Sequence, residues 1–429
     1  MIKNKTNYLY FAFIIELFLV FYFRNKLGFI VSPVLLLIAG LFLSIYPYFL
    51  LKNDSEAMLD INKHASTAGK KSRNLAWIIF GSLSLLYGFC SYFLFVKYPI
   101  DIHHSDIIPF INEVMVKRFL HGEMVYAPVA GFTSYVAFST PNYLPLHWIP
   151  FIIPALLNID SRWIIVFIFI LSAAFYLKQN ISNFQSARKV IFITFLPFAV
   201  VFTIFITQAQ NAVHTVEIMI MGYYLFLSSS LFSKSSFVKA SGITFPALSR
   251  YAFLFWLPVF FYGLLKNNLK RFFIIGFLFA LFIFIFFIIP FVLPIPEMLK
   301  TFNSVYIPGA VFEWKGQAWQ HAGDRPFQLF QGTGFASWFY MFYDGTLEEK
   351  VSALKNTLMT CCILSAVIPI VFYKKLTRVI PENIFSLLAL KYCLTIFYAL
   401  ILVPYVYLFW VPSIVSVVII SRIGEGEIK

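Results

Sequence analysis

Charged side chains are scarce in this chain. Only 12% of its residues are Asp, Glu, Lys or Arg, about half of the ~25% that is typical of soluble domains. Hydrophobic residues make up 60% and include 54 Phe, more than one globular core buries. Apolar runs of about 18 or more residues predict membrane spans. The composition therefore excludes an ordinary soluble protein, and neither a soluble domain nor an internal repeat is found in the sequence.

Metal-binding and disulfide patterns are also missing. The four Cys all lie in apolar runs, without the paired spacing of zinc sites or of a disulfide framework. There is no Asp-x-Asp and no pair of His at zinc-ligand spacing. We therefore predict a protein without a metal or other cofactor.

Basic residues give the chain a net charge of +14. They stand in short clusters between apolar runs, which is typical of cytoplasmic loops under the positive-inside rule. This pattern favours membrane topology over nucleic-acid binding, so no nucleic-acid partner is expected. The first apolar run follows Lys3 and Lys5 without a small-residue cleavage site, and we expect it to be a retained span.

The hydropathy pattern predicts an all-α fold, a polytopic transmembrane helical bundle of about 10–12 helices, in one integral membrane domain over 1–429. Outer loops that carry short juxtamembrane helices are expected at 97–142 and 294–350. The predicted spans cover 8–23, 27–51, 75–96, 163–177, 190–207, 213–232, 272–293, 351–373, 384–403 and 408–420.

Two apolar stretches are interrupted by proline. The stretch 143–157 contains Pro145, Pro150 and Pro154, so a kinked or partly inserted element is expected; whether it spans or dips stays open. The stretch 240–265 has basic clusters on both flanks and contains Arg250 between two prolines. A hairpin or re-entrant element is predicted, and such backbone is tolerated at membrane depth where it lines a cavity or is buried in protein.

The first outer loop carries an ordered motif: an Asp, an aromatic four residues later, a Gly-x-x-x-Tyr and then a Tyr-x-Pro at the next apolar run. These residues are Asp106, Phe110, Gly122, Tyr126, Tyr143 and Pro145. The order resembles the GT-C superfamily of integral membrane glycosyltransferases, most closely glycosyltransferase family 87, the polyprenyl-phosphate-mannose-dependent mannosyltransferases. Leu146 departs from the family pattern, which usually has a second Pro there.

Two further patches fit the same resemblance. The sequence Gln208-Ala-Gln210-Asn211 is similar to the family's Gly-Gln-x-Asn, with Ala209 in place of Gly and without the x. Arg250 stands where the family often has Lys. The resemblance implies a polyprenyl-phosphate sugar donor, a glycolipid or glycan acceptor, and an active site that faces the periplasm or exterior of a bacterial plasma membrane.

Asp106 is the predicted catalytic base. A carboxylate within hydrogen-bond reach of an acceptor hydroxyl can take its proton, and the phosphate leaving group needs little acid catalysis, so one carboxylate suffices for inverting transfer. An alternative interpretation makes Asp106 a helix N-cap. Asp101 is the rival base.

Substrate-binding residues are predicted around this base. Gln210, Asn211, His214 and Glu217 are spaced to share one helix face, where they bind substrate or form an interhelical hydrogen-bond patch. Arg250 either contacts the donor phosphate or extends to the cytoplasmic surface. Trp148 is expected to be an interface anchor. The remaining predicted substrate-binding residues are Tyr126, Tyr143 and His147.

The predicted function is transfer of a hexose, with mannose as the family expectation, from a polyprenyl-phosphate sugar to a lipid-linked or envelope glycan. A lipid-linked-sugar flippase or transporter is one alternative, although internal repeats are expected of that class. An envelope oligosaccharide ligase or polymerase is another, and His321 and Arg325 in the late outer loop keep it open.

Overall fold

The computed structural model describes residues 3–52, 70–101, 107–129, 141–181, 187–294, 296, 307–316 and 325–424, and the regular elements within these ranges are all helical. Eight helices are long and apolar enough to cross a membrane. The chain is thus an all-α, multi-pass membrane protein, as predicted. The eight spans are Thr6–Phe23, Lys26–Lys52, Ser72–Lys97, Trp163–Asn180, Arg188–Thr207, Leu269–Val292, Leu347–Val371 and Val406–Ile423.

The helices follow one another with few long gaps. In the first half they are α1 (Lys3–Phe18), α2 (Arg24–Lys52), α4 (Lys70–Lys97), α5 (Ile108–Phe110), α6 (Lys117–Leu120), α7 (Pro145–Trp148), α8 (Ile152–Leu156), α9 (Trp163–Asn180), α10 (Ala187–Thr207) and α11 (Ala209–His214). In the second half they are α12 (Glu217–Ser230), α13 (Ser236–Ala247), α14 (Leu257–Asn267), α15 (Leu269–Ile283), α17 (Ala336–Phe342), α18 (Leu347–Val371), α19 (Tyr373–Thr377), α20 (Glu382–Ala399) and α21 (Trp410–Ile419). Stretches of π-helix cover Leu19–Phe23, Ile111–Val116, Phe284–Val292 and Ile420–Gly424, and 3-10 turns cover Ile149–Phe151, Tyr251–Phe255, Phe327–Phe330 and Val406–Phe409.

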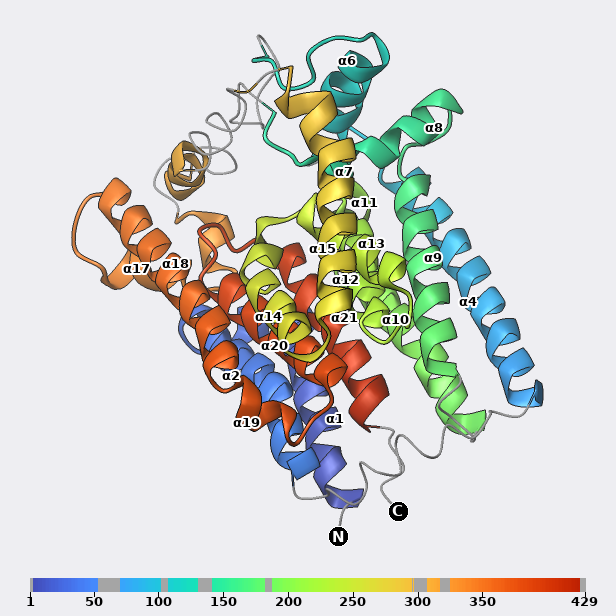
Figure 1. The fold of residues 1–429 in the computed structure, drawn as a ribbon. Coiled ribbons are helices and arrows are strands. Elements are labelled where there is room, and N and C mark those ends of the chain that lie inside the picture. The colour runs from blue at the N-terminus through green and yellow to red at the C-terminus, as the bar shows by residue number, and fades with distance from the viewer. Residues whose placement is uncertain are drawn as a thin grey trace.

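The bundle has two distinct ends. Both chain termini lie at one end, called the terminal end below, and the short helices α6 and α8 lie at the other, called the loop end (Figure 1). The predicted short juxtamembrane helices therefore gather on the side of the first predicted outer loop.

Helix α12 lies at the centre of the bundle and packs against α9, α13 and α21. Small residues permit the close approach, because a Cβ added to Gly222 would stand 3.3 Å from the backbone of Phe169, and one added to Gly242 would stand 2.2 Å from Ser230 Oγ. Such small-residue contacts are typical of helix packing in membranes.

Two of the ten predicted spans are not among the eight. The predicted span 213–232 is broken, because α11 ends at His214, Thr215 is extended, and α12 begins at Glu217. The predicted span 384–403 corresponds to α20, which is mostly buried within the bundle. The kink predicted in 143–157 is confirmed: α7, a 3-10 turn and α8 divide it.

The predicted hairpin is confirmed as well. Helices α13 and α14 run in opposite directions, and both pack against α15 (Figure 1). Their connection contains Arg250 and a 3-10 turn. The backbone N–H of Leu146 donates to the carbonyl of Leu248 at 2.9 Å, so the tip of the hairpin reaches the start of α7 at the loop end.

Candidate functional site

An ion pair between Glu217 and Arg250 lies at the centre of the candidate site. Glu217 is the first residue of α12, and Arg250 lies in the connection after α13. The Glu217 side chain is 2% exposed, whereas that of Arg250 is 26% exposed. A buried carboxylate is tolerated when it is paired, so Arg250 stabilises the charged form of Glu217 and does not extend to the cytoplasmic surface.

The pair leaves polar atoms unused. Glu217 Oε2 and Arg250 Nε are both buried and make no hydrogen bond to any residue that the structure describes. Buried polar atoms without a partner are rare. One carboxylate oxygen and one N–H therefore remain for a bound ligand or water to satisfy.

His147 lies beside this pair. The side chain is 1% exposed, and neither ring nitrogen has a hydrogen-bond partner within the described part of the chain. Burial, followed by the charge of Arg250, holds the pKa of His147 well below its usual range, against a smaller opposing effect of the Ser249 backbone. His147 is therefore neutral and presents one donor and one acceptor.

Tyr143 and Tyr126 hold the wall next to His147. The ring of Tyr143 stacks on that of His147, with centroids 5.0 Å apart and an interplanar angle of 9°. Tyr126 donates its hydroxyl hydrogen to the Tyr143 carbonyl at 2.8 Å and accepts from Trp148 Nε1 at 3.1 Å. Burial raises the pKa of Tyr126, so its hydroxyl stays neutral and positions Tyr143.

Trp148 does not anchor the chain at a membrane interface, and that prediction is wrong. Its side chain is fully buried and packs edge-on against Phe119 and Phe291, with centroids 5.5 Å away in both cases. The indole is therefore part of the protein core beneath the site, where its N–H finds an internal acceptor in Tyr126.

The predicted common helix face of Gln210, Asn211, His214 and Glu217 is also wrong. Thr215 interrupts the helix: its hydroxyl donates to the Asn211 carbonyl at 2.7 Å and accepts from the N–H of Glu217 at 3.4 Å. Such local bonding of Thr competes with helix continuation. Glu217 thus starts a new helix, while Gln210 is exposed and Asn211 half-buried.

His214 is buried and meets the ring of Tyr98 edge-on, with centroids 6.2 Å apart. Tyr98 directly follows α4, so this contact joins α11 to the chain segment that leads into the first predicted outer loop. The substrate-binding roles predicted for Gln210, Asn211 and His214 stay predictions.

Asp106, the predicted base, lies outside the described residues. Ile107 and Ile108, which follow it, are buried, and Phe110 contacts the ring of Tyr143 edge-on at 6.3 Å. The chain that directly follows Asp106 therefore packs on the wall of the site. Asp101 is half-buried, and its role as the rival base stays a prediction.

The late loop contributes mainly structural contacts. Arg325 lies over the rings of Phe330 and Phe29, 5.4 and 6.0 Å from their centroids, an arrangement that cation–π attraction favours. Trp314 is fully buried and donates to the Leu402 carbonyl at 2.8 Å. His321 lies outside the described residues.

Two tyrosines of the site were not predicted. Tyr223 donates to the Leu146 carbonyl at 3.0 Å. Tyr398, from α20, is buried without a hydrogen-bond partner for its hydroxyl among the described residues, and it interacts electrostatically with Arg250. The chain has 24 Tyr, and no local pattern distinguishes these two from the others.

The arrangement offers a neutral imidazole, a part-satisfied guanidinium and a part-satisfied carboxylate, which together can bind hydroxyl groups and an anionic oxygen. Comparisons of the chain with protein-family models, with curated proteins and with solved structures found no match. The chemistry of the site therefore has to be argued from its own residues.

Proposed function

We propose that this chain is a GT-C-type membrane glycosyltransferase of the family 87 kind. It would transfer a hexose, with mannose expected, from a polyprenyl-phosphate sugar to a lipid-linked or envelope glycan acceptor. The loop end would face the periplasm or exterior of a bacterial plasma membrane, because the positive-inside rule assigns the basic loops of the terminal end to the cytoplasm. The reaction would need no metal or other cofactor.

The observation that carries the proposal is the convergence of predicted residues from separate segments. Tyr126 bonds the Tyr143 carbonyl, Tyr143 stacks on His147, His147 interacts with Arg250, and Arg250 pairs with Glu217. A continuous chain of contacts thus joins three of the ordered motifs. An apolar bundle has little reason to concentrate ionisable groups in this way unless they function.

The free atoms of the cluster suggest how the work is divided. The unused N–H of Arg250 can donate to a donor phosphate oxygen, while the unused oxygen of Glu217 can accept from sugar hydroxyls. Asp106 would take the proton from the acceptor hydroxyl. The acceptor oxygen then bonds to the anomeric carbon from the face opposite the phosphate, and the phosphate leaves with the electron pair of its C–O bond.

Transfer from a defined donor tests the proposal. The full chain is purified and given polyprenyl-phosphate mannose with candidate glycolipid acceptors, and wild type is compared with Asp106→Asn, Asp101→Asn and Asp344→Asn. Loss of a general base typically costs about 10²–10⁴-fold in rate, and this loss is expected for Asp106→Asn alone. Asp344 is exposed in the connection between α17 and α18, so its substitution controls for the charge change.

Other outcomes would replace parts of the proposal. Full transfer by Asp106→Asn removes Asp106 as the base, and loss confined to Asp101→Asn assigns that role to the rival. Absence of transfer by wild type from mannose, glucose, galactose and arabinose donors refutes the function. Movement of the lipid-linked sugar across vesicles without transfer would support a flippase, and transfer of whole oligosaccharides that depends on Arg325 would support a ligase.

A further inference from the structure

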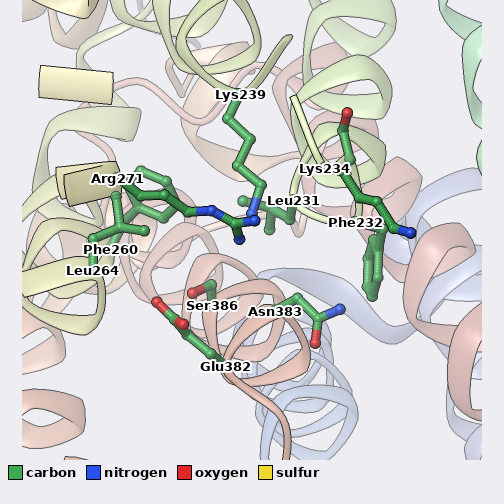
Figure 2. Close-up of a pocket in the computed structure, with 11 residues that line it drawn as sticks. Leu231, Phe232, Lys234, Lys239, Phe260, Leu264, Arg271, Glu382, Asn383 and Ser386 are labelled. Atoms are coloured by element: carbon green, nitrogen blue, oxygen red, sulfur yellow. The ribbon is translucent and has the colours of Figure 1, made fainter. Parts of the chain in front are cut away.

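A second polar site lies at the terminal end of the bundle. It is a cavity of about 240 Å³, many times the ~10–15 Å³ that one water requires. Its walls come from the end of α12, the starts of α13, α15 and α20, and the side of α14 (Figure 2). The residues that carry the argument are Lys234, Lys239, Arg271, Glu382, Asn383 and Ser386.

The charges around this cavity are unbalanced. Three cations, Lys234, Lys239 and Arg271, line it with a single carboxylate, that of Glu382. Glu382 attracts Lys239, yet neither Lys239 nor Arg271 forms an ion pair with it among the described residues. Lys239 and Arg271 also repel each other.

The side chains point into one space. Figure 2 shows the ammonium group of Lys239 and the guanidinium of Arg271 directed to the same side of the cavity, with the Glu382 carboxylate and the Ser386 hydroxyl coming from α20 opposite them. A bound anion would relieve the repulsion between the two cations, because it would place negative charge between them.

Helix dipoles add to the positive potential. Lys239 is the fourth residue of α13, Arg271 the third of α15, and Glu382 the first of α20. Three helices of 12, 15 and 18 residues thus begin at the cavity. Helix N-termini favour anions because their first N–H groups lack intrahelical partners.

The cavity lies at the edge of the apolar region. Arg271 stands at the start of the span Leu269–Val292, only 6% of whose apolar window is buried inside the protein. That span therefore presents most of its surface outward, where lipid surrounds it. Lys234 and Arg271 are exposed while Lys239 is half-buried, so the cavity opens at its rim. A phosphate at headgroup depth could enter it.

We propose that this cavity binds a phosphate-bearing anion, with the headgroup of an anionic membrane lipid as the favoured source. Lys239 and Arg271 hold the phosphate, Lys234 guides it at the rim, and Glu382 limits the affinity by repulsion. Basic pockets between transmembrane helices on the cytoplasmic side are known to suit such headgroups.

This site is separate from the Glu217–Arg250 cluster. Helix α12 begins at Glu217 and ends beside the cavity, and α13 starts at the cavity and ends near Arg250. At 1.5 Å per residue, the 12 residues of α13 place the two sites about 18 Å apart. Anion binding here therefore does not depend on glycosyl transfer.

Lipid retention tests the proposal. The full chain is placed in detergent with phosphatidylglycerol and phosphatidylcholine, and bound lipid is counted by native mass spectrometry. Each Lys or Arg near an anionic membrane surface contributes about 1 kcal/mol, so Lys239→Gln/Arg271→Gln should weaken phosphatidylglycerol binding about 30-fold. Lys270→Gln is the matched control, because Lys270 is an exposed neighbour of Arg271 that does not line the cavity.

A substitution of opposite sign guards against misfolding of the double variant. Glu382→Gln removes the carboxylate and should tighten binding several-fold. In a parallel arm, inorganic phosphate is added to the protein in phosphatidylcholine nanodiscs. A thermal shift that depends on Lys239 and Arg271 there, without phosphatidylglycerol selectivity, would assign the site to free phosphate. Equal weakening by Lys270→Gln, or unchanged binding in both the double variant and Glu382→Gln, would overturn the proposal.

Discussion

Removal of Arg250 should expose the energetic role of its partner. The carboxylate of Glu217 is 2% exposed, so in Arg250→Gln it cannot regain water without local unfolding. We expect the carboxyl to bind a proton in the folded variant. Glutamate in water has a pKa of about 4.3, and one pH unit corresponds to about 1.36 kcal/mol, so this protonation costs about 3.7 kcal/mol at pH 7. The free energy of unfolding should fall by a similar amount.

The pH dependence gives the sharper test. Above pH ~4.3 the folded variant holds a proton that the unfolded chain releases, so its stability falls as pH rises, by about 1.4 kcal/mol per unit. The stability gap between wild type and Arg250→Gln should therefore shrink from about 3.7 kcal/mol at pH 7 to about 1 kcal/mol at pH 5. The double variant Arg250→Gln/Glu217→Gln lacks the carboxyl and should show a gap that does not change with pH.

Reversible unfolding by SDS in mixed micelles at pH 5, 6 and 7 measures these gaps. Glu217→Gln alone should cost less than Arg250→Gln, because Arg250 is 26% exposed and its charge can reach water. A gap for Arg250→Gln that stays constant over this pH range would refute the reasoning, as would a double variant that follows the same slope.

Three other substitutions test the packing of the bundle by thermal unfolding in detergent. Arg162→Lys should cost about 2 kcal/mol, because buried Arg162 forks to two carbonyls at the end of α4 and one unsatisfied buried acceptor costs about 1–3 kcal/mol; an unchanged midpoint would contradict this. Gly242→Ala should cost about 1–3 kcal/mol by overpacking, since the new Cβ would stand 2.2 Å from Ser230 Oγ, and Ser230→Gly should restore part of the loss. Trp314→Phe should cost about 1–3 kcal/mol by leaving the Leu402 carbonyl without its donor, whereas replacement of an exposed aromatic should have little effect.

Membrane spans were predictable because their information is local. Eight of the ten predicted spans coincide with helices that can cross a membrane, since a long apolar run has one stable solution in lipid. The hairpin of α13 and α14 was predictable for a similar reason, because basic flanks on both sides and two internal prolines leave few alternatives.

The interruption at Thr215 was not predictable from periodicity. The residues around it are spaced like one helix face, and only the hydrogen bonds of the Thr215 hydroxyl show that the chain turns there. The two polar sites depend on contacts across the sequence as well. Arg250 reaches Glu217 from another helix pair, and Lys239 and Arg271 had been interpreted only as topology-setting charge.

The bundle holds a second buried ion pair, which shows by contrast what is unusual about the first. Lys391 bonds Glu16 and the Pro412 carbonyl, and the other oxygen of Glu16 accepts from Ser416 at 2.7 Å. Both carboxylate oxygens are thus satisfied, so this pair ties α1, α20 and α21 together without free valence. Because apolar replacement of a satisfied buried pair is often neutral or stabilising by about 1–4 kcal/mol, Glu16→Met/Lys391→Met should fold and keep glycosyl transfer. The same treatment of Glu217 and Arg250 should fold yet lose transfer. Equal activity of the two double variants would mean that the free atoms of Glu217 and Arg250 bind nothing during the reaction.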